Sequence, residues 1–568
     1  MKKRLLLPVY QLCAILIALN GIINVLSAWL IHYPARIALL VKVLPLVVIQ
    51  GSWLTLVTAG SMQLFLSFSL GRRKKLAWQI VVVVLILAMA TNLLRGLHYG
   101  QAAINLGLLL LLLVLKPHFT ADSDPPSVRH GVFIFLGTFV FTYLYGMFGF
   151  YLLDRHFHEH FDLLESSRQA LAFLAWVSTP EVGRPTLLAR LFLDSFAFLE
   201  TGGLVYGLSM ILRPVVYRRR TLPAERKWAK TILEQYGRSS LAFLTLLPDK
   251  FYYFSSSKKS FAAYTLVGNV AVVLGDPIGP VEDIPNLIAQ FKKTCERNDW
   301  HLIFFQVLPD YLPIYINLGF KVLKIGEEAI VDVQNFTLEG GARKSLRQSL
   351  NHALRKGLTT KLIVPPLDDD VLQQLKEVSE DWLKFQHGRE KRFSLGWFEL
   401  NYLRQCPVMV VLDAKGNIQA FANLISEYQR NEGTIDLMRR RGKDSGLMDL
   451  LFIRLIEYFR EQGYAGFNLG LTPLAGLGDQ PGTSVPEKVL NFYYHHFNQL
   501  YAFKGLRQFK EKFGPRWEPR YLIYTNPFLL PKIAVAITTA NAGGNLFLTY
   551  LGAWWEKRHF KKKNVPTK

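Results

Sequence analysis

Six long apolar stretches in the first 212 residues of this 568-residue chain constrain its fold more than any other feature. Each approaches the length that an α-helix needs to cross a bilayer, where backbone polar groups must be paired within the helix. The stretches cover residues 9–31, 43–69, 77–94, 102–116, 132–153 and 191–212. The sequence therefore predicts a membrane domain over residues 1–220 with about six transmembrane helices, of which the fourth is the shortest.

Short basic segments predict the orientation of these helices. The chain begins with Met-Lys-Lys-Arg, Arg72–Lys75 lies between the second and third stretches, and Arg218–Arg220 follows the sixth. Basic loops stay on the cytoplasmic side of a membrane, and an inside N-terminus places all three segments there. No small-residue cleavage site accompanies the first stretch, so we expect an anchor rather than a signal peptide. We therefore expect a multi-pass protein of the cell membrane with a cytoplasmic catalytic domain.

The remaining chain changes to short β-rich runs separated by amphipathic helices, a pattern typical of α/β folds. A first unit over residues 235–335 has expected strands at 241–247, 261–267, 269–274, 302–307 and 328–333, and helices at 282–298 and 311–320. A second unit over residues 340–525 has expected helices at 340–356, 368–386, 445–462 and 486–500, and strands at 408–413, 418–426, 433–439 and 466–470. The predicted fold class is an α-helical polytopic membrane domain followed by two tandem α/β units.

The C-terminal region, residues 528–568, is apolar from Phe528 to Trp555 and then basic. A further span would place the basic tail outside, against the charge rule, and Gly543 and Gly544 interrupt the run. We therefore expect a broken helix lying in the inner membrane interface, followed by a basic tail.

Charge and cysteine content narrow the function. The net charge is +23, and most of it follows residue 212, which favours an anionic partner such as nucleic acid or phospholipid headgroups. Cys13, Cys295 and Cys406 are far apart, so we expect neither a disulfide framework nor a metal site. The segment Phe503–Tyr521 alternates cations with aromatic rings. This composition suits a phosphate-bearing ligand, although a solvated basic helix ending at Gly514 would share it.

Several motifs, in order along the chain, resemble the lysylphosphatidylglycerol synthase family, also called phosphatidylglycerol lysyltransferases or multiple peptide resistance factors. They are Val272–Pro280 (VVLGDPIGP), Arg343–Gly357 (RKSLRQSLNHALRKG), Phe393–Gly396 (FSLG), Asp436–Arg440 (DLMRR), Asn468–Leu474 (NLGLTPL) and Phe503–Tyr521. The resemblance implies two acetyltransferase-like (GNAT-like) units. These would transfer an aminoacyl group, most commonly lysyl, from aminoacyl-tRNA to the glycerol hydroxyl of phosphatidylglycerol. No cofactor is implied, because the tRNA ester is already activated.

Two features differ from the family's broader pattern. The segment Arg439–Gly446 (RRRGKDSG) lacks the GxGxxG/A turn that holds a pyrophosphate on backbone amides, which argues against an acyl-CoA donor. Relatives that also flip their product have a longer membrane region than six spans, so flipping is not predicted. Two alternative functions remain open, a membrane-bound transferase acting on another acceptor and a lipid transporter with a headgroup-binding domain. Homo-oligomerisation also remains open.

The resemblance implies a catalytic group formed by Asp436, Arg439 and Arg440. Asp436 is expected to hold the ammonium of the donor amino acid, or to form a buried ion pair with one of these arginines. The guanidinium groups suit phosphate oxygens or a developing oxyanion. A general base is not identified by the pattern. His495 and His496 are chemically suitable, but they equally fit the wet end of a packed helix.

The expected substrate-binding residues come from three parts of the chain. Arg347, Asn351 and Lys356 lie on adjoining parts of one predicted helix, which could instead be simply solvated. Asn468 belongs to a family motif. The basic segment contributes candidates for lipid phosphate or the tRNA acceptor end, namely Lys504, Arg507, Lys510, Glu518 and Arg520. Glu518 and Arg520 are also expected to pair with each other.

Overall fold

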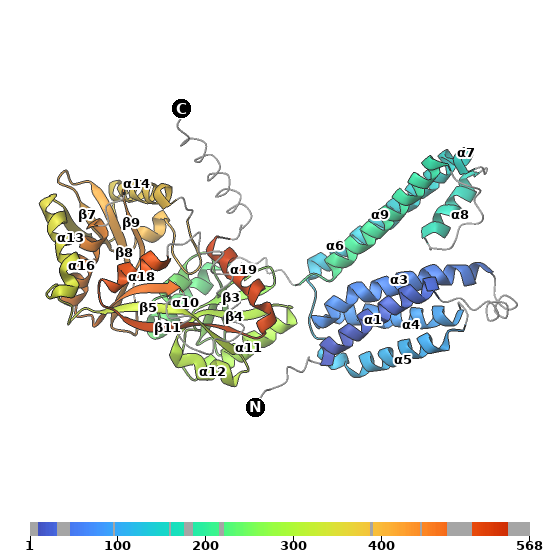
Figure 1. The fold of residues 1–568 in the computed structure, drawn as a ribbon, viewed down its shortest axis with the longest axis horizontal. Helices are drawn as coiled ribbons and strands as arrows, with labels where there is room; N and C mark the ends of the chain where they lie inside the picture. Colours follow the sequence, from blue (N-terminus) through green and yellow to red (C-terminus); the bar gives the residue numbers. More distant parts are fainter. Residues whose placement is uncertain are drawn as a thin grey trace. The chain divides into compact units, whose positions relative to one another are not determined.

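A computed structural model describes residues 9–30, 46–94, 97–157, 161–174, 186–214, 221–386, 390–425, 427–442, 446–473 and 503–543 (Figure 1). The chain divides into two compact units. The first comprises Met1–Val216 with the short segment Thr294–Trp300, and the second comprises the rest of the chain from Tyr217. The first is helical and the second is a mixed α/β structure.

All six apolar stretches form helices in the helical unit, as predicted. They are α1 (Val9–Leu30), α3 (Leu46–Gly71), α4 (Lys75–Leu94), α5 (Tyr99–Val114), α6 (Pro125–Leu152) and α9 (Leu187–Ile211). Within the residues that the structure describes, four helices are long and apolar enough to cross a membrane, namely α1, α4, α6 and α9. Two short helices, α7 (Asp154–Phe157) and α8 (Leu163–Leu174), and the 3₁₀ turn η1 (Lys116–His118) complete this unit. The helix α5 is short, as expected from the fourth apolar stretch, which is the shortest in the sequence.

Glycine allows α1 and α3 to approach each other closely. A Cβ atom on Gly21 would lie 2.6 Å from the carbonyl oxygen of Gly60, and a Cβ atom on Gly60 would lie similarly close to the carbonyl oxygen of Gly21. Beside this crossing, the buried Asn20 amide donates to Gln63 at 2.8 Å and to Asn105 at 2.9 Å. Close backbone contact and interhelical carboxamide bonds are the usual means by which apolar helices select their neighbours in a bilayer.

The α/β unit contains one eleven-stranded sheet with the order β1-β2-β3-β4-β11-β5-β10-β9-β8-β7-β6. Its strands are β1 (Phe251–Phe254), β2 (Phe261–Val267), β3 (Val270–Leu274), β4 (His301–Val307), β5 (Lys321–Asp332), β6 (Thr359–Ile363), β7 (Val408–Leu412), β8 (Ile418–Ile425), β9 (Glu432–Arg440), β10 (Gly466–Pro473) and β11 (Arg516–Tyr524). Most strands carry the β-branched and aromatic residues that favour a pleated, half-buried surface.

The two predicted units are visible in this sheet as a repeated order of strands. In each half, antiparallel strands lead to a parallel pair joined by a helix, β3-α11-β4 in one and β9-α16-β10 in the other. The last strands are exchanged between the halves. β5 of the first unit pairs with β10, whereas β11 of the second pairs with β4, and β5 and β11 pair with each other. One continuous sheet therefore joins the two units.

The helices lie on both faces of this sheet. They are α10 (Pro223–Tyr236), α11 (Ile284–Arg297), α12 (Leu312–Asn317), α13 (Lys344–Arg355), α14 (Asp369–Gln386), α15 (Leu400–Leu403), α16 (Gly446–Glu461), α18 (Phe503–Glu511) and α19 (Leu530–Asn541), with 3₁₀ turns at η2 (Phe243–Leu246), η3 (Pro309–Tyr311), η4 (Gly341–Arg343) and η6 (Pro527–Leu529). Helices α13 and α16 lie side by side on the second unit (Figure 1). They share a hydrophobic core with α18, whereas α14 and α19 contribute to a different core.

Several sequence expectations need correction. Residues 241–247 were expected to form a strand, but they contain the 3₁₀ turn η2, whose leucines fill a core without pairing in the sheet. Strands β1 and β6 were not predicted. The helix expected to lie in the membrane interface begins as α19, whose Leu530, Ile533 and Ala536 are buried in the core of the α/β unit against β2 and β3. The expected helix at 486–500, with His495 and His496, lies outside the described residues.

Candidate active site

Asp436 lies on β9 at the centre of a buried hydrogen-bond network. Its Oδ1 accepts a bond from the Gly396 backbone N–H at 2.8 Å, and its Oδ2 accepts one from the Tyr402 hydroxyl at 2.7 Å. The Asn423 amide donates to the same hydroxyl at 2.8 Å, and its Oδ1 accepts from Leu437 N. Burial raises the pKa of Asp436 above its ordinary value, although both hydrogen bonds act in the opposite direction.

The Phe393–Gly396 motif is explained by this carboxylate. A Cβ atom on Gly396 would lie 1.8 Å from Asp436 Oδ2, so only glycine lets the loop reach the carboxylate. Phe393 has a positive φ of 64° and is almost fully buried. Its backbone N–H donates to Asp249 Oδ2 at 2.8 Å, which connects this loop to the first unit.

Lys250 brings a buried cation to the same region. Its Nζ donates to Asp249 Oδ1 at 2.7 Å and lies 5.6 Å from the centre of the Phe393 ring. Burial lowers the pKa of Lys250, while Asp249 and, more weakly, Asp436 act to raise it. Lys250 follows η2 in the first unit, so both units contribute charged groups around Asp436.

Arg439 and Arg440 are the last two residues of β9, and their side chains lie in different environments. Arg439 is buried and forms a bidentate pair with Glu390, with N···O distances of 2.8 and 2.6 Å, and it also donates to Ser379. Arg440 donates to the Gly442 carbonyl at 2.9 Å and lies over the Trp382 ring at 5.6 Å. The buried ion pair of Asp436 with either arginine, one of the two sequence alternatives, is therefore not found among the described residues.

The parallel strands β9 and β10 separate beside Asp436. They are paired from Glu432 with Gly466 to Thr434 with Asn468, and beyond that point β9 pairs with β8 while β10 pairs with β5. Directly after the separation, Lys510 of α18 donates to the carbonyls of Gly470 and Leu471 at 2.8 and 3.1 Å. Burial lowers the pKa of Lys510 to about 7, so this amine can exchange a proton near neutral pH.

Asn468 connects this strand separation to a buried ion pair at the centre of the sheet. Its amide donates to Glu328 Oε2 at 3.0 Å, and Glu328 also accepts from Ser240 at 2.8 Å and pairs with Arg520. Burial opposes the charge on Glu328, but Arg520 and the hydrogen bonds outweigh it and lower its pKa. Glu518 and Arg520 lie 3.4 Å apart, as their pairing predicted.

The other predicted binding residues lie apart from this centre. On α13, Arg347 is half-buried and donates to the carbonyls of Leu338 and Gly340, whereas Asn351 is exposed, as is Lys356 directly after the helix. On α18, Arg507 pairs with Glu511 at 3.0 Å. Lys504 also belongs to α18, and its side chain lies outside the described residues. The whole basic segment was expected to suit a phosphate-bearing ligand, but Lys510 and Arg520 are buried, whereas Arg507 is half-buried and Arg516 is exposed.

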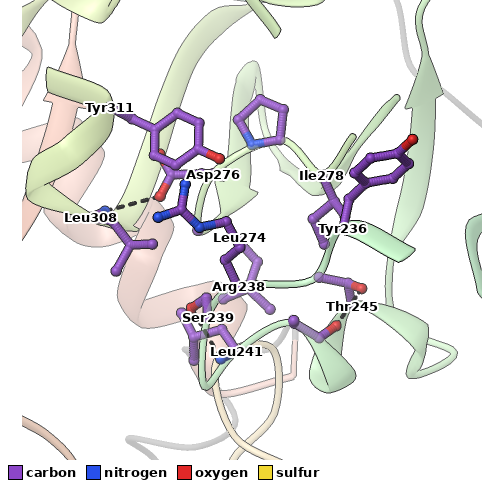
Figure 2. A pocket seen from close by; sticks show the side chains of 13 residues that line it. Tyr236, Arg238, Ser239, Leu241, Thr245, Leu274, Asp276, Ile278, Leu308 and Tyr311 are labelled. Atoms are coloured by element: carbon purple, nitrogen blue, oxygen red, sulfur yellow. Dashed lines mark hydrogen bonds between the residues drawn. The ribbon is translucent and has the colours of Figure 1, made fainter. Parts of the chain in front are cut away.

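The motif VVLGDPIGP of the first unit borders a small cavity (Figure 2). Its volume is about 20 Å³, which holds about one water molecule, and Arg238, Asp276 and Tyr311 are among the residues that line it. Asp276 accepts from Leu308 N at 2.9 Å and from the Tyr315 hydroxyl at 3.0 Å, and burial raises its pKa to about 7. The cavity is too small for an aminoacyl group, so Asp276 supports the turn after β3.

Comparison with known proteins identifies the family. The family model for the C-terminal part of phosphatidylglycerol lysyltransferase matches residues 230–524. The chain belongs to the phosphatidylglycerol lysyltransferase family. Two relatives carry that name, one from Bacillus subtilis (30% identity over 81% of this chain and 52% of the relative) and one from Staphylococcus epidermidis (35%, 58% and 39%). The chain thus spans about half or less of the length of these relatives.

A solved structure of this family supports the fold. L-PGS from Bacillus licheniformis is 34% identical, with a TM-score of 0.53, over 58% of this chain and 98% of that chain. The expected fold class, a helical domain with apolar spans followed by two tandem acetyltransferase-like units, is confirmed. Together with the apolar helices, the family membership fits a membrane protein.

Four important residues of this site were not found from the sequence. Glu390, Tyr402 and Glu328 each stand far along the chain from the groups that they contact, and Lys250 contacts the distant Phe393 ring as well as its neighbour Asp249. Only the Asp249-Lys250 pair carried a signal, because two adjacent charges follow the apolar run Leu241–Leu247. Tertiary contacts alone define the other three.

Proposed function

We propose that this protein transfers an aminoacyl group, most commonly lysyl, from aminoacyl-tRNA to the glycerol hydroxyl of phosphatidylglycerol. The observation that carries the proposal is the buried Asp436 network at the parting of β9 and β10, inside the region that matches the family model. The relatives' printed name supports the lipid acceptor and the lysyl group. The net charge of +23 supports two anionic substrates.

The reaction exchanges one ester for another. The lipid hydroxyl oxygen attacks the carbonyl carbon of the aminoacyl ester, and a new carbon–oxygen bond forms. The bond from that carbon to the ribose oxygen of the tRNA then breaks, and the lipid hydroxyl proton ends on the ribose oxygen. No oxidant, reductant or external energy source is needed, so the site must supply positioning, proton transfer and charge stabilisation.

We assign the positioning of the donor amino acid to Asp436. Its carboxylate is partly buried and already fixed by Gly396 and Tyr402, so it presents a pre-oriented negative charge. An α-ammonium group placed against it would compensate that charge, which burial alone disfavours. Arg439 is fixed by Glu390 and supports the end of β9, so it serves as a positioning residue in this scheme.

Lys510 is our candidate for the proton transfer. With a pKa of about 7, a large fraction of its amines is neutral at physiological pH and can accept the lipid hydroxyl proton. The carbonyls of Gly470 and Leu471 fix its Nζ. The protonated amine can then return the proton to the leaving ribose oxygen.

The substrates would arrive from different surfaces. The exposed Asn351 on α13 and Lys356 directly after it, together with Arg507 on α18, offer polar and cationic groups to the phosphates of tRNA or lipid. The orientation that the positive-inside rule favours would place the α/β unit in the cytoplasm, where aminoacyl-tRNA is available.

The test uses the purified full chain with labelled aminoacyl-tRNA and phosphatidylglycerol vesicles. We expect label to enter the lipid fraction, and RNase treatment of the donor to abolish this. Vesicles of phosphatidylcholine, which lacks the glycerol hydroxyl, serve as the acceptor control. Failure of label to reach the lipid with any common amino acid would overturn the proposal.

A further inference from the structure

The loop that reaches Asp436 has no regular secondary structure of its own. Residues 390–399, which we call the 390–399 loop, precede α15 and contain neither helix nor strand. The backbone N–H groups of such a loop are not paired in a helix or a sheet, so they need other partners wherever the loop is buried. The place of Gly396 against Asp436 therefore depends on the groups that hold this loop.

The C-terminal end of α19 holds the loop at two points. The Arg392 backbone N–H donates to the Asn541 carbonyl at 2.9 Å. The buried Ser394 hydroxyl donates to Asn541 Oδ1 at 2.8 Å, and the Ser394 N–H approaches the same oxygen at 3.4 Å. Asn541 is the last residue of α19, where backbone carbonyls have no partner within the helix and can accept bonds from another segment. Asn541 thus contacts the loop with both its backbone and its side chain.

This contact lies close to Asp436 along the chain. Gly396 follows Ser394 by two residues, and its N–H donates to Asp436 Oδ1 at 2.8 Å. Leu395 between them is 42% exposed and Gly396 has no side chain, so side-chain packing does little to fix this stretch. The backbone here is therefore held mainly by the hydrogen bonds of Ser394 and Gly396.

The helix α19 is itself fixed in the fold. Its Ile533, Ala536 and Ala540 are buried in the core that also contains Phe393 and Trp397, the two large side chains on either side of Ser394–Gly396. The helix also contacts β2 and β3. It lies beyond residues 230–524, the region that the family model matches. The contact with Asn541 therefore adds to the site an element that the matched region does not contain.

We propose that Asn541 is a positioning residue of the transferase site, which holds Ser394 so that the Gly396 N–H faces Asp436. This inference rests on the proposed function, in which Asp436 holds the ammonium group of the donor amino acid. Without the Asn541 side chain, the loop keeps the bond from Phe393 to Asp249, but the buried Ser394 hydroxyl loses its acceptor. The carboxylate of Asp436 is then less firmly oriented, and donor binding weakens.

The first test follows the loop itself and does not depend on transfer. In the full chain in detergent micelles, hydrogen–deuterium exchange of a peptide covering residues 390–397 should be about 2- to 10-fold faster in Asn541→Leu than in the wild type. Asn541→Asp keeps an acceptor oxygen for Ser394 and should exchange as the wild type does. Val535→Thr changes an exposed residue of α19 and serves as the control, which should also match the wild type. Equal exchange in Asn541→Leu and the wild type would overturn the inference.

The second test uses lysyl-tRNA and phosphatidylglycerol vesicles. Asn541→Leu should raise KM for lysyl-tRNA by about 2- to 10-fold and leave KM for the lipid unchanged, and Asn541→Asp should restore the wild-type value. Loss of folded protein alone would lower the maximal rate and change neither KM. Ser394→Ala should raise the same KM, and combining it with Asn541→Leu should add little, because both remove one contact.

The two tests fail in different ways. A wild-type KM for lysyl-tRNA in Asn541→Leu, or fully additive effects of Ser394→Ala and Asn541→Leu, would overturn the positioning role. If the wild type transfers no label from any donor, the proposed function fails, and the exchange of residues 390–397 alone decides whether Asn541 holds the loop.

Discussion

Lys510 gives a prediction whose magnitude follows from the structure. The side chain is buried, and burial lowers its pKa from 10.5 to about 7. Between these values the unfolded chain binds one proton more than the native state at this position. The free energy of unfolding therefore rises with pH in this range, by at most about 1.4 kcal/mol per pH unit. Over the whole range, charged Lys510 costs the native state about 5 kcal/mol.

The perturbation is Lys510→Met, which keeps an unbranched apolar chain but loses the bonds to Gly470 and Leu471. The free energy of unfolding of the variant should not rise between pH 7 and 10. Relative to the wild type, the variant should therefore be most stable at acid pH. Urea unfolding in detergent micelles, followed by tryptophan fluorescence at pH 6.5, 8 and 9.5, measures this. The exposed Lys415→Met serves as a control and should parallel the wild type. Equal pH slopes for Lys510→Met and the wild type would refute the reasoning.

Two further substitutions test the packing of the site. Gly396→Ala forces Asp436 to move, because the new Cβ would lie 1.8 Å from its Oδ2. Unfolding free energy should fall by about 1–3 kcal/mol and transfer by at least about 10-fold, whereas Gly505→Ala, with nothing within 4 Å, should do neither. Arg520→Met leaves Glu328 buried without its cation and should cost about 3–5 kcal/mol, measured by the same unfolding assay. Adding Glu328→Gln should restore part of this loss, and a double variant no more stable than Arg520→Met would contradict the pairing.

The sequence was sufficient to predict those helices whose apolar residues follow a local pattern along the chain. The apolar stretches became α1, α3, α4, α5, α6 and α9, and the amphipathic pattern of residues 282–298 became α11. It was insufficient where pairing partners are distant. Residues 516–524, which follow the expected helix end at Gly514, were not among the strands placed in either unit, yet they form β11 between β4 and β5, because strand exchange satisfies their backbone in the middle of the sheet. No local pattern encodes that exchange.

In the candidate site, too, the sequence pointed to single residues but not to their distant contacts. Asp436 was singled out from its motif, and it lies beside the separation of β9 and β10. Its actual partners, Gly396 and Tyr402, lie 40 and 34 residues away. Composition grouped Lys510 with the other cations of Phe503–Tyr521 as candidates for phosphate binding, but Lys510 is buried and burial lowers its pKa. Burial depends on tertiary packing, which a charge pattern does not contain.

The most direct test of the central claim is the transfer rate of Asp436→Asn. The amide has the same shape as the carboxylate and retains an acceptor for Gly396 or Tyr402, but it cannot compensate an ammonium charge. With labelled lysyl-tRNA and phosphatidylglycerol vesicles, we predict at least a 100-fold lower rate of lipid labelling, equivalent to about 3 kcal/mol of transition-state stabilisation. The amount of protein in the membrane fraction should equal that of the wild type. Lipid labelling by Asp436→Asn at the wild-type rate would contradict the account.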